Sequence, residues 1–174
     1  KFISRGSFPQ IQYGLNLGLE YKNFDFSALF AGAAHFNISY DTELQRPFNN
    51  GANSFEMYMD RWRHEDIYDP SSPWIKGKYP STMAGGTENN NKYSTFWVKN
   101  GDYLRLKNLV IGYTIPKTLL SKVGIGNARV YASGQNLFII SGVDNMDPEV
   151  FANASRGAYY PIQKVYTFGV NIGF

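Results

Sequence analysis

The amino-acid sequence predicts an all-β fold, in which about five antiparallel strands form one segment of a larger transmembrane β-barrel with long extracellular loops and a short loop helix. Three observations support this fold class. Segments of the chain alternate between apolar and small or polar side chains. The composition is rich in residues that suit strands and membrane interfaces, with 13 Tyr, 13 Phe, 3 Trp and 17 Gly. The connections between these segments are alternately short and long.

The last strand is the clearest, because residues 164–174 alternate without interruption. Successive side chains of a strand point to opposite faces, and about ten tilted residues span a bilayer. One face would therefore contact lipid and the other, small or polar, would line a lumen. The lipid-facing row would consist of Tyr166, Phe168, Val170, Ile172 and Phe174.

Two further strands, 11–21 and 24–34, alternate in the same way and predict a hairpin with Lys22-Asn23 as its turn, in which Asn23 would adopt the positive φ. A third strand is expected at 103–115, where the apolar positions change phase. One extra residue near Lys107-Asn108 would restore the phase, so we predict a β-bulge there.

Pro116 would end the third strand, and residues 118–123 would form one helical turn before Gly124. The fourth strand is expected at 128–139, with a bend at Gly134.

The remaining connections, 36–102 and 141–163, are long. In outer-membrane barrels the short turns are periplasmic and the long loops extracellular, so both are predicted to be extracellular loops. Within the first, residues 54–65 predict a short helix capped by Asn53 or Ser54. Its apolar positions would be Phe55, Tyr58, Met59 and Trp62.

Several classes of function find no support in the sequence. No run of about eighteen apolar residues is present, so no transmembrane helix is expected. The chain has no Cys, and its net charge of +3 comes without a basic run, which argues against thiolate chemistry and nucleic-acid binding. No nucleophile motif is found, and we expect no enzymatic activity.

No metal or cofactor is expected either. His35 and His64 are the only histidines, and they lack ligand-like spacing. Two acidic groups, Asp66 and Asp69 near His64 and a second formed by Asp144, Asp147 and Glu149, are better explained as solvated loop clusters.

Longer motifs resemble the SusC/RagA family of TonB-dependent outer-membrane transporters of Bacteroidetes. They are the stretch GDYLRLKNLVIGYTIPK (101–117), RVYASGQNLF (129–138) and the terminal YTFGVNIGF (166–174). Shorter matches occur at Asp147-Pro-Glu149, Tyr160-Pro161 and Arg61-Trp62. The resemblance covers most of the chain and is weakest in 77–93.

The resemblance implies a barrel of about twenty-two strands, closed by an N-terminal plug. It also implies a SusD-like surface lipoprotein that covers the barrel, energy transmitted by TonB through a segment near the N-terminus, and import of oligosaccharides or, in the RagA branch, oligopeptides. Because the chain starts without Met at Lys1, we expect residues 1–174 to be the C-terminal portion of the barrel, separated from its plug and from the TonB-contact segment.

Aromatic side chains in or beside the first long loop are candidate ligand contacts: Trp74, Tyr79, Tyr93 and Trp97. They could stack on sugar rings or contact a peptide, with Asn89, Asn90 and Asn91 offering hydrogen bonds. An alternative places Trp97 and Tyr103 in an interfacial girdle, and Trp62 in loop packing or the lid interface. By resemblance, the terminal aromatic row is also an outer-membrane assembly signal that ends at Phe174.

Two other hypotheses stay open at this point. A soluble carbohydrate-binding β-sandwich would also alternate, but it would bury residues such as Leu15, Leu17 and Phe168 in one core. A purely structural or adhesive barrel would need no energy-coupling segment.

Overall fold

The structure is a computed structural model that describes residues 5–82, 89–121, 124–149 and 159–174. The chain forms two compact units. The sheet unit comprises residues 9–35, 102–142 and 161–174, and the loop unit comprises 1–8, 36–101 and 143–160. Each unit is described by itself.

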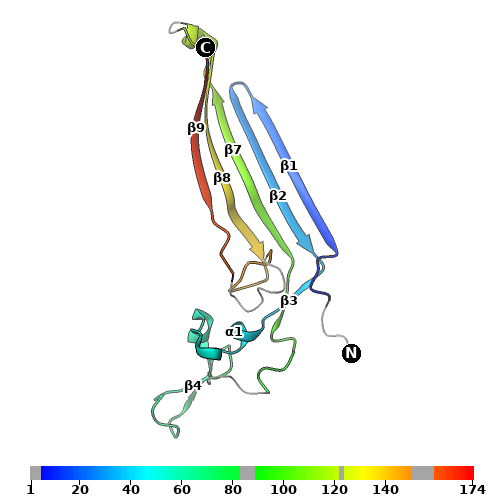
Figure 1. Ribbon diagram of the computed structural model, residues 1–174, viewed down its shortest axis with the longest axis vertical. Helices are drawn as coiled ribbons and strands as arrows, with labels where there is room; N and C mark the ends of the chain where they lie inside the picture. Colours follow the sequence, from blue (N-terminus) through cyan, green and yellow to red (C-terminus); the bar gives the residue numbers. More distant parts are fainter. Residues whose placement is uncertain (1–4, 83–88, 122–123, 150–158) are drawn as a thin grey trace. The chain divides into compact units, whose positions relative to one another are not determined.

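The sheet unit is a five-stranded antiparallel sheet in the order β1-β2-β7-β8-β9 (Figure 1). The strands are β1 (Ile11–Tyr21), β2 (Phe24–Ala34), β7 (Tyr103–Thr114), β8 (Asn127–Ser141) and β9 (Val165–Gly173). All five agree with the predicted strands to within two residues at each end. β1 and β9 form the two edges of the sheet.

The predicted bulge in β7 is confirmed. Leu29 and Phe30 of β2 are consecutive, yet they pair with Asn108 and Leu106, so Lys107 is the additional residue. The extra residue returns the apolar side chains of β7 to one face. On the other side of β7, the pairing with β8 shifts at the same place.

Because of this register, one face of the sheet is apolar across all five strands. One such row runs through directly paired residues: Leu19, Phe26, Ile111, Ala132 and Phe168. Most of the large side chains on this face are exposed, and Phe168 has 81% of its surface accessible. Leu15, Leu17 and Ile172 are exposed too, so the buried core required by the soluble-sandwich hypothesis is not formed by these residues.

Two local predictions in the sheet unit are wrong. The hairpin turn between β1 and β2 has its positive φ at Lys22 (55°) instead of Asn23, and the Asn23 side chain donates to the carbonyl of Thr114 at 2.8 Å. Gly134 pairs regularly with its neighbours, and the irregularity in β8 falls at Asn136, which has a φ of 52°. An Asn tolerates this left-handed conformation better than most residues with a Cβ.

The helical turn after β7 is α2 (Lys117–Leu120), one residue earlier than predicted because Pro116 already takes the N-cap position. Its last two predicted residues, 122 and 123, lie outside the described residues. Gly124 follows with a φ of 73°, a conformation that suits glycine at the end of a helix.

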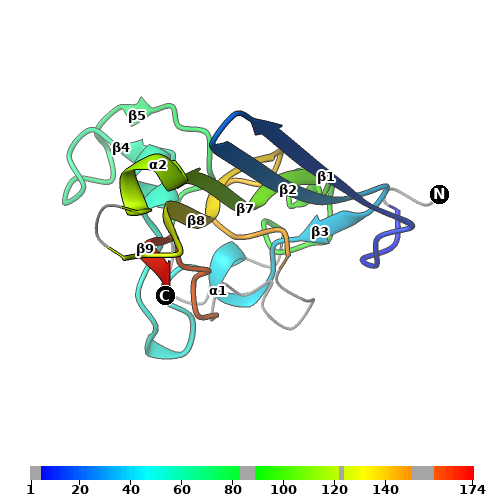
Figure 2. The same cartoon turned by 90° about the horizontal axis from the view of Figure 1, so that it is seen from above.

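The loop unit contains short elements. They are β3 (Asn37–Ser39), α1 (Thr42–Gln45), the 3₁₀ helices η1 (Asn49–Gly51) and η2 (Glu56–Asp60), β4 (Arg63–His64), β5 (Trp74–Ile75) and β6 (Val98–Asn100). β3 pairs with β6, and β4 pairs with β5, which lies beside it in Figure 2. Among the described residues, no helix is long and apolar enough to cross a membrane.

The predicted helix at 54–65 is wrong. Only the five residues of η2 are helical, its N-cap is Phe55, and neither Asn53 nor Ser54 caps it. The chain becomes extended at Arg61, and the N–H of Trp62 donates to the carbonyl of Tyr79 at 2.9 Å. Long-range pairing with the segment near Tyr79 therefore replaces the hydrogen bonds of a longer helix.

Candidate functional site

The loop unit has an aromatic core. Trp97 is 2% exposed, and Tyr58 and Tyr79 are buried as well. The rings of Tyr58 and Tyr79 lie 5.6 Å apart, Tyr79 meets Phe96 edge-on at 6.0 Å, and Phe96 meets Trp97 edge-on at 4.7 Å. These separations are those of favourable aromatic pairs, so the four rings form a continuous cluster.

Polar atoms of this core are satisfied by backbone groups. The indole N–H of Trp97 donates to the carbonyl of Asn90 at 2.6 Å. The hydroxyl of Tyr58 donates toward the carbonyls of Leu44 (3.0 Å) and Gln45 (2.8 Å). Burial raises the pKa of Tyr58 above its ordinary value, because the ionised phenolate would lose its hydration.

A second buried tyrosine joins two segments of the loop unit. Tyr40 donates its hydroxyl to the carbonyl of Asp144, and the Tyr40 ring is almost completely buried. Burial raises the pKa of Tyr40 as well. Residues 104 positions apart are thereby held together.

A hollow of about 370 Å³ opens on the aromatic cluster. Trp62 and Phe96, which are 41% and 39% exposed, present accessible aromatic surface there, whereas Tyr79 and Trp97 contribute buried surface. The other lining residues are polar or small: Lys78, Pro80, Asn89, Asn90 and Ser94. A concave site with aromatic faces and a few polar groups is the usual form of a small-ligand site.

Of the four predicted ligand contacts, the structure brings two to this hollow, Tyr79 and Trp97. Trp74 lies instead on the β4–β5 hairpin, where its ring packs against His64 with centroids 3.9 Å apart. Tyr93 is exposed and does not line the hollow. The girdle placement of Trp97 is wrong, since Trp97 is a core residue of the loop unit. Tyr103 is the first residue of β7.

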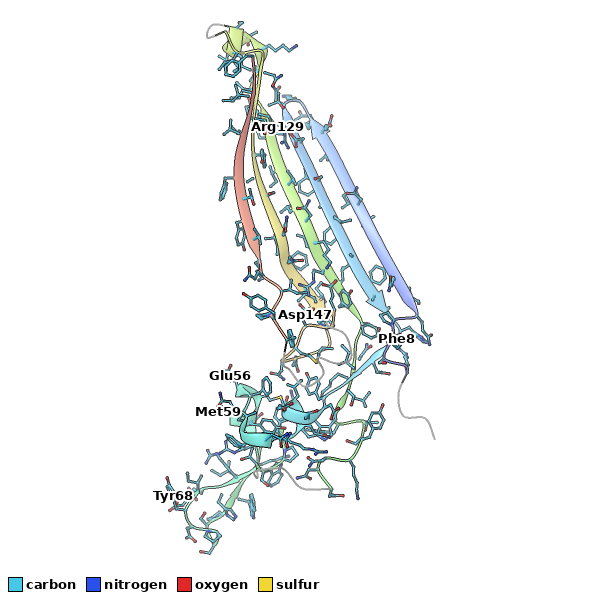
Figure 3. All side chains as sticks on the ribbon, viewed as in Figure 1. Phe8, Glu56, Met59, Tyr68, Arg129 and Asp147 are labelled. Atoms are coloured by element: carbon cyan, nitrogen blue, oxygen red, sulfur yellow. The ribbon has the colours of Figure 1, made fainter. Side chains whose placement is uncertain are left out.

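The hairpin of β4 and β5 also holds the first acidic group. Asp69 accepts bonds from the hydroxyl (2.6 Å) and the backbone N–H (2.9 Å) of Ser71, and these bonds lower the pKa of Asp69. Tyr68 projects from the same hairpin, where Figure 3 labels it, and is 89% exposed. The imidazole Nδ1 of His64 lies 2.7 Å from the carbonyl of Ser72. The hydrogen bonds of Asp69 and His64 therefore stabilise the turn between the two strands.

The other predicted polar residues also have partners within the protein. Asp147 accepts the backbone N–H of Glu149 at 3.0 Å, and the carboxylate of Asp144 lies 3.7 Å from the ammonium of Lys78. His35 places its Nδ1 2.5 Å from the side-chain oxygen of Gln10. In the described part of the chain, no three His, Cys, Asp or Glu residues are grouped so that they could hold a metal ion.

Sequence reasoning missed an ion pair on the polar face of the sheet. Arg129 of β8, labelled in Figure 3, donates its Nε–H to Asp25 of β2 at 2.9 Å, across the intervening strand β7. The residue between them is Gly112, where a Cβ atom would collide with both side chains. The signal was present as a glycine in an otherwise well-formed strand, but its two partners lie 104 residues apart.

No protein-family model matches the chain. The chain is 29% and 31% identical, each over 95% of its length, to the TonB-dependent receptors P3 and P26 of Formosa agariphila. It is 28% identical over its full length to the TonB-dependent receptor SusC of Bacteroides thetaiotaomicron. It spans only 16%, 17% and 16% of the lengths of these three relatives.

Solved structures give the same relationship. The RagAB peptide transporter matches with a TM-score of 0.68 and 26% identity, over 98% of this chain and 18% of that one. The RagAB peptide importer in its open-open state matches with a TM-score of 0.63 and 26% identity, over 96% of this chain and 17% of that one.

Proposed function

The chain belongs to the SusC/RagA family of TonB-dependent receptors, and on that premise we propose that it forms the C-terminal wall and extracellular loops of an outer-membrane nutrient importer. The observation that carries this proposal is the apolar face of the sheet. It is continuous over five strands in register, and most of its large side chains are exposed. Acyl chains of the outer membrane would cover this face.

The edges of the sheet supply a second argument. β1 and β9 each have one neighbour in the sheet. An unpaired backbone N–H or C=O in hydrocarbon costs several kcal/mol, so spanning strands need partners on both sides. The remaining barrel strands of the same transporter would pair with β1 and β9, and the polar face would enclose its plug. TonB would act through the N-terminal portion of the full protein.

The loops 36–102 and 141–163 would then be extracellular and would meet a SusD-like surface lipoprotein. The relative SusC gives this proposal its basis. We take oligosaccharides as the cargo. Oligopeptides are the second candidate, because the matching solved structures are described as a peptide importer.

The decisive test compares two adjacent residues of β1 in the full-length transporter. Leu17 is on the apolar face and Asn16 on the opposite one. Leu17→Arg should weaken insertion by about 2–4 kcal/mol, since a charge on the lipid face is most destabilising near the midplane. Asn16→Arg should be tolerated. The measurement is the amount of heat-modifiable barrel in outer-membrane fractions, and equal amounts for the two variants would contradict the lipid-facing assignment.

The partner is tested separately. The assembled transporter, extracted in mild detergent, should co-purify with a surface lipoprotein from the same cells. An assembled barrel that is active in uptake yet purifies alone, also after chemical cross-linking of whole cells, would remove the lipoprotein from the proposal.

A further inference from the structure

Lysine side chains lie at the hollow of the loop unit and beside the residues that line it. Lys78 lines the hollow. The ammonium of Lys99 lies 5.3 Å from the ring centroid of Phe96, a lining residue, and 5.6 Å from that of Tyr40. Lys92 reaches the side-chain oxygen of Asn89, another lining residue, at 3.5 Å. One lysine therefore lines the hollow, and two others contact residues of its lining.

The two lysines nearest the aromatic faces are close enough to affect each other. Burial first, and then the charge of Lys78, lower the pKa of Lys99, while the nearby carboxylate of Asp144 raises it. Repulsion of this kind means that a negative group placed between the two ammonium groups would be favoured.

The carboxylate of Asp144 is the protein's own anion near both lysines, and a ligand anion would have to replace it. Asp144 faces the Lys78 ammonium at 3.7 Å, with 56% and 69% of the two side chains exposed. An exposed pair with this separation contributes little to stability and is readily exchanged. The carboxylate of Asp60 accepts the backbone N–H of Lys78, at 3.3 Å. A ligand anion could therefore take the place of Asp144 without disrupting the core.

The backbone around the hollow argues for a saccharide over a peptide. Peptides that add to a protein as a strand need unpaired main-chain groups. Here the N–H of Tyr79 donates to Asp60 and its carbonyl accepts from Trp62. The N–H of Trp97 donates to Ser94, and the carbonyl of Asn90 accepts the indole N–H of Trp97. Recognition would thus depend on side chains: aromatic faces, amides and ammonium groups.

We propose that this hollow is a subsite for an acidic sugar residue, a uronate or a sulfated pyranose. Its ring stacks on Trp62 and Phe96, its hydroxyls bond to Asn89 and Asn90, and its carboxylate or sulfate lies between Lys78 and Lys99. The inference rests on the proposed function, whose cargo it narrows to anionic oligosaccharides.

The test uses the full-length transporter, assembled and purified in detergent, and isothermal titration calorimetry. The probes are tetragalacturonate, a chondroitin-sulfate tetrasaccharide, neutral maltotetraose and an acidic tetrapeptide. At least one of the two acidic saccharides should bind at least tenfold more tightly than maltotetraose and than the peptide. Lys78→Gln, at an exposed position, should remove most of that tenfold preference, whereas Lys76→Gln, two residues away and outside the lining, should keep it.

A second pair of variants tests stacking. Trp62→Ala should weaken binding of the preferred acidic saccharide at least fivefold, and Trp74→Ala, an exposed aromatic of the same unit outside the hollow, should leave it within twofold. Every variant is first checked for normal heat-modifiable assembly, so that a failure of the barrel is distinguished from a failure of the subsite. An assembled transporter that binds the neutral sugar or the peptide as tightly as both acidic sugars, or an acidic preference that survives Lys78→Gln, would overturn the inference.

Discussion

The sheet unit and the loop unit use the same residue types in opposite ways. In the sheet, aromatic and aliphatic side chains such as Tyr166 and Phe168 are exposed on one face. In the loop unit, Trp97, Tyr40 and Tyr58 are buried and bonded to backbone carbonyls. The difference shows that an aromatic-rich composition does not predict whether the rings are exposed or buried. That depends on the strand or loop in which each ring lies. The apolar face of the sheet is left uncovered by the described residues, whereas the rings of the loop unit are buried against one another.

The largest effect should come from removing the centre of the loop core. Trp97→Ala leaves a cavity and removes the indole hydrogen bond to the carbonyl of Asn90, and should destabilise the loop unit by about 3–5 kcal/mol. Limited proteolysis of the assembled transporter should cut residues 36–101 much faster, while the barrel stays heat-modifiable. Trp74→Ala, which is exposed, is the matched control. Loss of the barrel itself would show that the two units depend on each other.

The second-largest effect should come from alkaline pH, which should destabilise the loop unit and not the sheet unit. In the unfolded chain, tyrosine loses its proton near its ordinary pKa of 10.0, whereas burial raises the pKa of both Tyr40 and Tyr58 in the fold. Their contribution is complete below pH 10 and is lost as the pH rises above it, by about 1.4 kcal/mol per pH unit for each tyrosine. Tryptophan fluorescence combined with absorbance at 295 nm should report loop unfolding above pH 10. The double variant Tyr40→Phe/Tyr58→Phe should reduce this slope, and an unchanged slope would contradict the assignment.

A smaller effect should follow from adding a side chain at Gly112, beneath the ion pair of the sheet. Gly112→Val would force Asp25 and Arg129 apart, and we expect a loss of about 1–3 kcal/mol in barrel stability, as is common for overpacking. Urea unfolding in detergent is the measurement. The penalty should shrink when both charged side chains are first replaced by Ala, and a penalty independent of that replacement would exclude the collision as its cause.

The smallest effect concerns the apolar face. The hydroxyl of Tyr13 donates to the carbonyl of Tyr103 at 2.8 Å, and its ring covers Gly32. Tyr13→Phe keeps the ring and removes one hydrogen bond, so barrel stability should fall by about 0.5–1.5 kcal/mol. Tyr166→Phe on the same face is the control, and equal effects of the two substitutions in urea unfolding would remove the special role of Tyr13.

Prediction from sequence succeeded where a short local pattern determines structure. The change of apolar phase placed the bulge at Lys107, and alternation located all five strands. It failed where distant segments compete with local preference. The apolar spacing around Tyr58 suggested a helix over 54–65, but pairing of Trp62 with Tyr79 ends the helix after Asp60. Only Tyr79 and Trp97 of the predicted ligand contacts reach the hollow, because its lining combines segments whose contacts no periodicity encodes.

The sequence by itself determined the strands, their two faces and the positions of the two short connections, since a period of two and a proline or glycine act within a few residues. Only the tertiary structure decided which charges meet across Gly112, and which lysines lie at the hollow or beside its lining residue Phe96. Such meetings depend on strand register and on loop closure over tens of residues, and no local pattern carries that information.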